Sequence, residues 1–287
     1  MKPNHNLKPY LILAGILAVL MLITAFAGTF FPAIYRDFTR AQRVAESQGQ
    51  DVVTLFIGLP LLLIAVRLTQ RGDARGPLLW VGTLGYTLYV YLVYAYGGLY
   101  NILFPLYVAI MGLCIFSIIG VLNGVNAGAI NAHFTDKAPR KLVAGYFLGT
   151  VLLLTFIWGA AVTNAILTKT PDEGTLIYVT DLAFVLPVFA LAGVWLWQRK
   201  PWGDVLAGVM LVKAVTLGLS IAAGQIIAYS QNVGGDLFLA VFFAAFTVIG
   251  LAADQRRRVG SGLKAVDDGR VLEGAYRHAL CPLPHRQ

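Results

Sequence analysis

The stretch Tyr178-Val-Thr-Asp181-Leu-Ala-Phe-Val-Leu-Pro187 begins an apolar run that ends at Trp197, and a basic turn, 198–204, leads into a second apolar run. Each run is long enough to cross a hydrocarbon core of about 30 Å as a helix. Asp181 lies in the first run and Lys213 in the second. Charged side chains are costly inside a membrane, so they normally face a bundle interior or a wet cavity, where they mark functional sites. The stretch therefore predicts two membrane helices that carry a polar site.

The composition extends this prediction to the whole chain. Hydrophobic residues make up 58% of it and charged residues 13%, with a mean hydropathy of +0.72, whereas a soluble domain has about 25% charged residues. Strand-type alternation is absent, so we predict an all-α integral membrane protein whose transmembrane helices fill residues 1–254. A basic cytoplasmic tail, 255–287, follows. About eight runs are long enough to span: 10–31, 52–69, 77–97, 100–122, 142–168, 175–197, 204–228 and 237–253.

The distribution of lysine and arginine predicts the orientation. If the N-terminus lies inside, the segments between spans on that side carry most of the basic residues, whereas the opposite side carries Arg36, Arg40, Arg43 and Lys169. Basic loops stay on the cytoplasmic side, so we expect a multi-pass protein of the cell (inner) membrane with both termini cytoplasmic. In the alternative interpretation, residues 1–27 form a cleaved signal peptide, which would leave seven helices.

Two apolar runs align without a gap, Thr54-Leu-Phe-Ile-Gly-Leu-Pro60 over Asp181-Leu-Ala-Phe-Val-Leu-Pro187. Both would cross the membrane in the same direction and both end in a basic turn. Parallel repeats of this kind occur in transporters. The alignment raises the hypothesis of two four-helix halves in the same orientation.

The segment 32–51 permits two interpretations, a short amphipathic helix in the membrane interface or a solvated loop. Asp51, which ends it, fits the N-cap of the second span, because aspartate accepts bonds from the first free N–H groups of a helix. In the fifth span, Gly145 and Gly149 form a GxxxG pattern, which permits close helix packing.

Several further polar residues fall inside the spans. Tyr86 and Tyr89 lie near the middle of the third span, and a buried tyrosine hydroxyl needs a hydrogen-bond partner. The simplest explanation is bonding between helices; the sharper one is that both tyrosines line a cavity with Lys213. We therefore expect a ligand-binding set in an outward-facing polar cavity: Lys213, Asp181, Tyr86, Tyr89, Asn164, Gln225 and Asp51.

Other site chemistries find no support in the pattern of residues. There is no nucleotide-binding loop, no metalloprotease helix and no cysteine–histidine spacing for a metal, and Cys114 and Cys281 lie far apart. We expect neither a cofactor nor a metal. The basic residues are distributed as the orientation rule requires and form no patch for nucleic acid. We therefore expect membrane lipid, and not nucleic acid, to be the partner that surrounds the protein.

These observations favour a carrier or binder of a small polar or anionic solute. Lys213 would supply positive charge, and Asp181 would set its protonation or take a coupling proton. Two alternatives remain: an enzyme embedded in the membrane that acts on lipid-like substrates, and a sensor or assembly subunit in which Asp181 and Lys213 only fix the packing of helices. An enzyme is the less favoured of these, because no catalytic cluster is visible.

Overall fold

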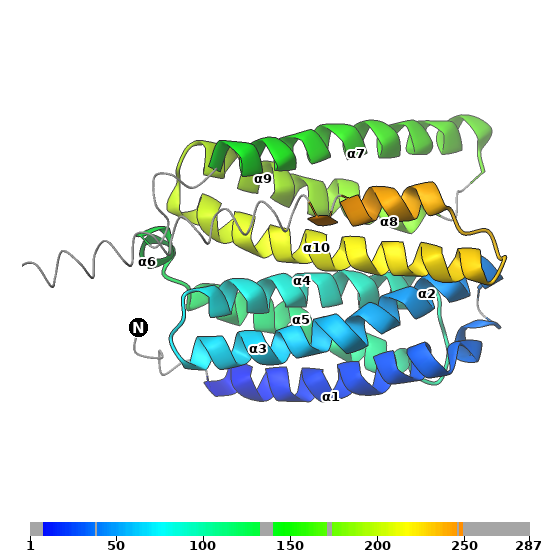
Figure 1. The fold of residues 1–287 in the computed structure, drawn as a ribbon, viewed down its shortest axis with the longest axis horizontal. Coiled ribbons are helices and arrows are strands. Elements are labelled where there is room, and N and C mark those ends of the chain that lie inside the picture. Colours follow the sequence, from blue (N-terminus) through cyan, green and yellow to red (C-terminus); the bar gives the residue numbers. More distant parts are fainter. Residues whose placement is uncertain (1–7, 38, 133–139, 171–173, 246, 249–287) are drawn as a thin grey trace, which may run out of the picture.

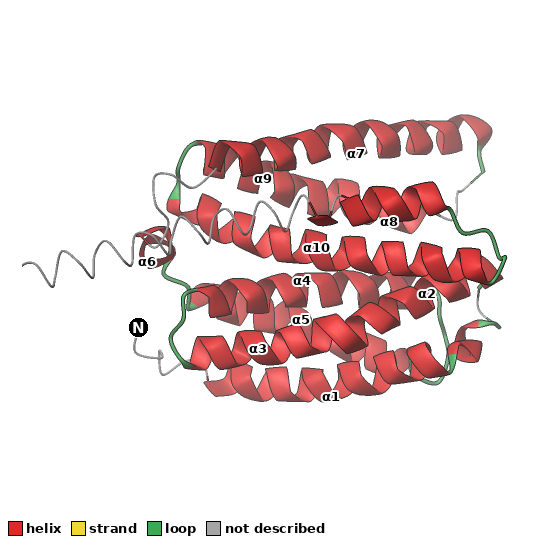
Figure 2. Cartoon of the chain, in the orientation of Figure 1, coloured by secondary structure: helices red, strands yellow, loops and turns green. Residues whose placement is uncertain are grey.

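The computed structural model describes all residues except 1–7, 38, 133–139, 171–173, 246 and 249–287. Within the described residues all regular structure is helical (Figure 2), and seven helical stretches are long and apolar enough to cross a membrane. The prediction of an all-α, multi-pass membrane protein is confirmed. The seven spans are α1 (Lys8–Phe30), Ala41–Gln70, α4 (Arg75–Tyr96), α5 (Phe104–Asn123), α7 (Arg140–Thr168), Thr175–Trp197 and α10 (Pro201–Ser230).

The eighth expected span, 237–253, is described only in part. Residues 237–245 are helical, and the rest of the run falls mostly outside the described residues. The expected tail, 255–287, also lies outside them.

The helix α10 lies at the centre of the bundle. It packs against α2 (Ala41–Val53) and α4 on one side and against α9 (Leu186–Trp197) on the other, and it runs along the whole length of the molecule between these neighbours (Figure 1). The short helix α6 (Ala127–Ala132) lies near its N-terminal end. Lys213 is thus on this central helix, about 18 Å along its axis from Pro201 at 1.5 Å per residue.

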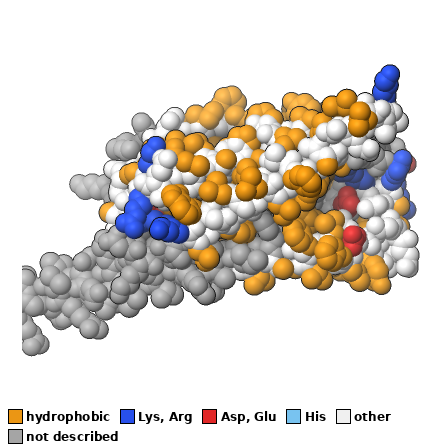
Figure 3. All heavy atoms as spheres, turned by 90° about the horizontal axis from the view of Figure 1, so that it is seen from above, with side chains coloured by type: hydrophobic (Ala, Val, Ile, Leu, Met, Phe, Trp, Pro, Cys, Tyr) orange, Lys and Arg blue, Asp and Glu red, His pale blue; other side chains and the backbone are white. Residues whose placement is uncertain are grey.

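The surface agrees with a membrane setting. On the face shown in Figure 3, apolar side chains cover the middle of the molecule, and lysines and arginines gather toward its two ends. Large apolar side chains such as Leu152 and Phe156 on α7 are more than 70% exposed. A soluble monomer rarely exposes such a belt, whereas lipid tails solvate it well.

From residue 41 onward the segment 32–51 belongs to the second membrane span, so both interpretations are wrong for that part. A short 3₁₀ helix, η2 (Pro32–Tyr35), is followed by α2, which continues without a break through the π-helix η3 (Thr54–Gly58) into α3 (Leu59–Gln70). Hydropathy missed α2 because its polar side chains find partners on neighbouring helices. Gln48, for example, donates a hydrogen bond to the carbonyl oxygen of Thr29 at 3.0 Å.

Asp51 is not a helix N-cap. It lies in the last turn of α2 and is completely buried, ten residues after Ala41, where the helix begins. The prediction failed because it placed the start of the helix at the first apolar residue. The carboxylate makes tertiary contacts instead, as described below.

Two spans contain a π-helix at the same place. In each, five residues with π-helical bonding stand directly before a Leu-Pro pair: η3 before Leu59-Pro60, and η4 (Asp181–Val185) before Leu186-Pro187. In the second case α8 (Thr175–Thr180) precedes the π-helix and α9 follows it. Proline has no N–H to donate, so the preceding turn must rearrange its hydrogen bonds, and π-turns of this kind are frequent at functional sites.

A buried ion pair joins two helices at the end of the bundle where α10 begins. Asp204 in the first turn of α10 is completely buried and accepts a hydrogen bond from Asn131 Nδ2 at 2.6 Å. Arg140, the first residue of α7, contacts both of its carboxylate oxygens at 3.3 Å. The hydrogen bond from Asn131 joins α6 to the start of the central helix, and the ion pair joins α7 to it.

We expect Asp204→Asn to destabilise the protein by about 2–3 kcal/mol. Asparagine keeps the shape of the aspartate side chain but removes the negative charge opposite Arg140. Thermal unfolding of the protein in detergent measures the change. The matched control is Asp73→Asn, since Asp73 bonds only the nearby Arg75 N–H at the same end of the bundle. Equal melting temperatures for the two variants would contradict the prediction.

Candidate functional site

Lys213 lies against one face of α4. Its ammonium nitrogen is 4.4 Å from the centre of the Tyr89 ring, a distance at which a cation is attracted to the face of an aromatic ring. One turn earlier on α4, Gly85 lies beside the stem, where a Cβ would make an ordinary contact with Lys213 Cγ at 3.9 Å. Gly85 and Tyr89 thus lie against the lysine side chain, and Lys213 is only 5% exposed.

Asp181 approaches from the neighbouring span. It begins the π-helix η4, is 7% exposed, and accepts a hydrogen bond from Trp158 Nε1 of α7 at 3.0 Å. The Trp158 ring stacks on Tyr178 with 4.6 Å between centroids, which holds the indole in place. Asp181 also interacts with both Lys213 and Tyr89. Residues from four spans therefore meet at this point.

Asp181 and Lys213 are not in direct contact. Within the described chain no ion pair joins them, although they interact electrostatically. The Tyr89 side chain interacts with both groups. The arrangement leaves a charged ammonium and a carboxylate near one another but not bonded to each other.

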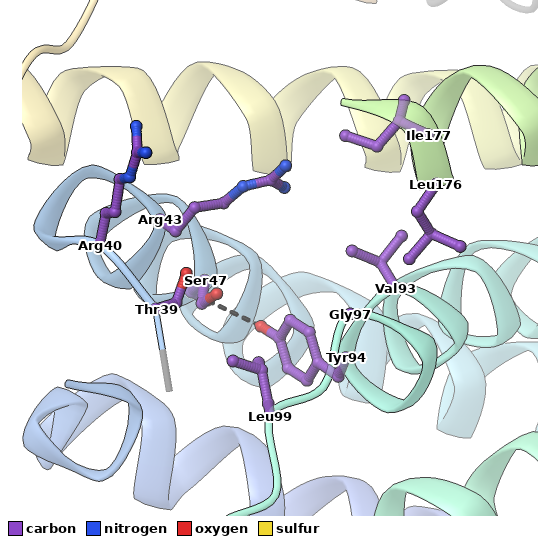
Figure 4. A pocket seen from close by; sticks show the side chains of 10 residues that line it. All are labelled: Thr39, Arg40, Arg43, Ser47, Val93, Tyr94, Gly97, Leu99, Leu176 and Ile177. Carbon is purple, nitrogen blue, oxygen red and sulfur yellow. Dashed lines mark hydrogen bonds between the residues drawn. The ribbon is translucent and has the colours of Figure 1, made fainter. Parts of the chain in front are cut away.

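A pocket of about 360 Å³ opens at the end of the bundle where α2 begins and α4 ends (Figure 4). Its polar wall comes from α2 and the residues just before it, and its apolar wall from α4 and α8. Arg40 and Arg43 reach into this region from α2 and its N-cap (Figure 4), and Tyr94 donates a hydrogen bond to the Ser47 carbonyl oxygen at 2.8 Å. The lining residues are Thr39, Arg40, Arg43, Ser47, Val93, Tyr94, Gly97, Leu99, Leu176 and Ile177.

The pocket lies close to the lysine site along two of the spans. Val93 and Ile177 line the pocket, and the residues four positions earlier or later on the same helices are Tyr89 and Asp181. Residues four apart share one face of a helix, one turn from each other. The side chain of Arg43 also interacts with Tyr89. The pocket therefore lies about one helical turn from Tyr89 and Asp181, the residues that interact with Lys213.

No family model, curated protein or solved structure matches this chain.

The structure gathers some of the expected binding residues and separates others. Tyr89, Asp181 and Lys213 meet as described. Tyr86 points to a different neighbour, since its hydroxyl lies 2.9 Å from the Thr54 hydroxyl and donates to the Gln50 carbonyl at 3.2 Å. Tyr86 therefore forms a hydrogen bond between helices, as the simplest explanation of this residue predicted.

The other three expected residues lie elsewhere. Gln225 is occupied by a donated bond to Glu46 at 3.1 Å and an accepted bond from the Asp236 N–H at 2.9 Å. Asn164 is exposed on α7, and its place in the binding set stays a prediction. Asp51 belongs to a separate cluster of tyrosines. The periodicity of a single helix could not have shown which of these residues lie in the lysine site, because their partners come from other helices.

Three residues that were not expected from the sequence also help to build the site. Trp158 bonds Asp181, and Arg40 and Arg43 line the pocket. The arginines were assigned to a connecting segment, and a tryptophan near mid-span is normally apolar packing. Their position could have drawn attention to them. Basic residues are few on the side of the membrane opposite the cytoplasm, and Arg40 and Arg43 are two of them.

No metal site is evident in the described part of the chain, where no group of three or more histidine, cysteine, aspartate or glutamate side chains comes together.

Proposed function

We propose that this protein binds a small polar or anionic solute in the pocket and carries it across the membrane past Lys213. The observation that supports the proposal most directly is the 360 Å³ pocket with two arginines at its polar wall, about one helical turn from the residues around the buried Lys213. Arginine recognises carboxylates through paired hydrogen bonds, so Arg40 and Arg43 suit the entry of an anion. Lys213 would supply a second positive charge deeper in the bundle.

Asp181 would balance Lys213 when no solute is present. The two groups are near but not bonded, so an anion that approaches the ammonium would compete with the carboxylate for it. Neutralisation of Asp181 by a proton would then favour solute binding. In this proposal the carboxylate sets the charge of the site and can take a coupling proton.

We also propose that the chain consists of two parallel four-helix halves. One gapless register pairs η3 with η4, α3 with α9, and the start of α4 with the start of α10 to within about a residue. In the same register Gly76 and Gly203 correspond, and a Cβ on either would overlap the backbone of the preceding helix at the corresponding positions, Thr69 and Leu196. Shared packing at matched positions supports a repeat more strongly than shared leucines do.

The repeat relates the lysine site in one half to a hydrogen-bonded pair in the other half. The same register pairs Thr54 with Asp181 and Tyr86 with Lys213, so a neutral hydrogen-bonded pair in one half corresponds to a charged pair in the other. The equivalent helices α4 and α10 pack on each other, which puts Lys213 at the contact between the halves and near the middle of its span. Transporters built from repeats bind their substrates at such a place.

The orientation is part of the proposal. Lys and Arg are most abundant at the end of the bundle opposite the pocket, which supports a cytoplasmic location for that end and an outward-facing pocket. For a bacterial chain this would be the inner membrane.

Binding of small carboxylates tests the proposal. Acetate and succinate are titrated by calorimetry into the full chain in lipid nanodiscs, and Arg43→Gln is expected to weaken binding of the better ligand about tenfold. Lys169→Gln, which changes a basic residue at the same end outside the pocket lining, is the matched control and should bind normally. Uptake of the radiolabelled ligand into proteoliposomes then separates a carrier from a binder. The anion site would be rejected if neither acetate nor succinate bound. An equal loss of affinity in Arg43→Gln and Lys169→Gln would also reject it.

A further inference from the structure

A second buried carboxyl group, Asp51, lies apart from the lysine site. It is completely buried, and its Oδ2 accepts a hydrogen bond from the Tyr35 hydroxyl at 2.6 Å. Its other oxygen, Oδ1, is buried without a hydrogen-bond partner. The backbone of α1 closes the site, because a Cβ at Gly28 would overlap both Asp51 Oδ2 and the Tyr35 hydroxyl.

Among the described residues, this carboxyl group has no basic partner. It interacts with Tyr35 of η2 and with tyrosines of α4 and α5, namely Tyr86, Tyr91, Tyr94 and Tyr107. No described lysine or arginine forms an ion pair with it. The charged groups of the adjoining helices are engaged elsewhere: Arg43 with Glu46 on α2 itself, and Lys213 of α10 with Tyr89 and Asp181. The only charged residue of α1, Lys8, is at its opposite end.

An ionised carboxylate in such a place would be very costly, since a buried charge needs a counter-charge or several hydrogen bonds. Tyr35, which lies outside the spans, remains a hydrogen-bond donor over the whole working range of pH, because burial raises the pKa of its phenol well above the usual value. One donated bond does not replace the water that a full charge loses. A neutral acid, with its carbonyl oxygen bonded to Tyr35 and its proton on Oδ1, fits the geometry.

We infer that Asp51 is a proton-binding site, distinct from the Lys213 site, that is occupied in this conformation. Binding adds one proton to the carboxylate and gives the neutral acid; no other bond changes. Tyr94 places this site beside the pocket, because it lines the pocket, bonds Ser47 and interacts with Asp51. Movement of Tyr94 or Tyr35 would admit water to Oδ1 and release the proton.

Infrared spectroscopy of the full chain in lipid tests the inference without any solute, so its outcome is independent of the proposed transport. At neutral pH we expect a carboxylic-acid carbonyl band that shifts in D₂O and is lost in Asp51→Asn. The matched control Asp73→Asn should retain the band, because Asp73 lies at the opposite end of the bundle and has a backbone partner.

A second variant keeps the test decisive if Asp51→Asn does not fold. Tyr35→Phe removes the hydrogen bond to the carbonyl oxygen, so the band should remain but move to higher frequency. A spectrum with no band that depends on Asp51 or Tyr35 would overturn the inference. A band that appears only after sodium and potassium are removed would also overturn it, because a metal cation would then be the natural occupant.

Discussion

Gly49→Val should remove most of the stability of the bundle, at a cost above about 4–5 kcal/mol. Gly49 on α2 and Gly224 on α10 meet where the two helices cross. A Cβ at Gly49 would overlap the backbone of Gly224, and one at Gly224 would lie 2.9 Å from the Glu46 Cα atom. Backbone atoms cannot turn aside as a flexible side chain can, so the helices must separate.

Separation would be costly because α2 and α10 pack on each other and both carry buried residues. It would also break the bond from Gln225 to Glu46 at 3.1 Å that spans the same crossing. A total stability of about 5–15 kcal/mol leaves little in reserve. The yield of monodisperse protein after extraction in detergent and its thermal unfolding measure the effect.

Gly145→Val is the matched control for this prediction. Gly145 is also a helical glycine, but it is exposed on α7 and nothing lies within 4 Å of a Cβ there. Its substitution should change stability by less than about 0.5 kcal/mol. If both variants fold equally well, the close crossing of α2 and α10 is not required. The same open space means that the close packing expected from the GxxxG pattern at Gly145 and Gly149 is not made within the described chain.

Lys213→Met should destabilise the protein by about 3 kcal/mol, and Asp181→Asn in the same chain should restore part of that loss. The single variant leaves Asp181 buried without its cation, which is the costly half of a broken buried pair. The bond from Trp158 remains and limits the cost. In the double variant no charge is left, so we expect a coupling energy of about 1–3 kcal/mol.

A double-mutant cycle of thermal or denaturant unfolding in detergent measures that coupling. The cycle of Lys213→Met with Asp204→Asn, a carboxylate at the end of the same helix that is paired with Arg140, is the control and should be additive. Additive effects for Lys213 and Asp181 would show that the two charges do not sense each other. If the double variant folds well but no longer binds carboxylates, the pair serves the proposed site rather than packing alone.

The spans were predictable from the sequence because each is a local property. A run of about 20 apolar residues has to form a helix in hydrocarbon, since its backbone polar groups have no other partners there. Seven expected runs therefore reappear as helices with shifts of a few residues at most ends. The exception is the second, which begins at Ala41 instead of near residue 52, because the polar side chains of α2 are satisfied by other helices.

The site was predictable only in part. Intramembrane charge pointed correctly to Asp181 and Lys213 as residues held inside the bundle. Which tyrosine accompanies them was not evident, because Tyr86 and Tyr89 are three positions apart and their positions along the span are nearly equal. The rotation of α4 against α10 turns Tyr89 to the lysine and Tyr86 to Thr54.

The sequence by itself determined that this chain is a helical membrane protein with charged groups inside two of its spans, because hydropathy acts on each residue regardless of its neighbours. Only the tertiary structure decided which polar groups meet: Lys213 with Tyr89 and Asp181, and Asp51 with Tyr35. Those contacts depend on the rotation and crossing of helices distant in the chain, which close contacts such as Gly49 with Gly224 impose. A pattern read along one helix carries no record of them.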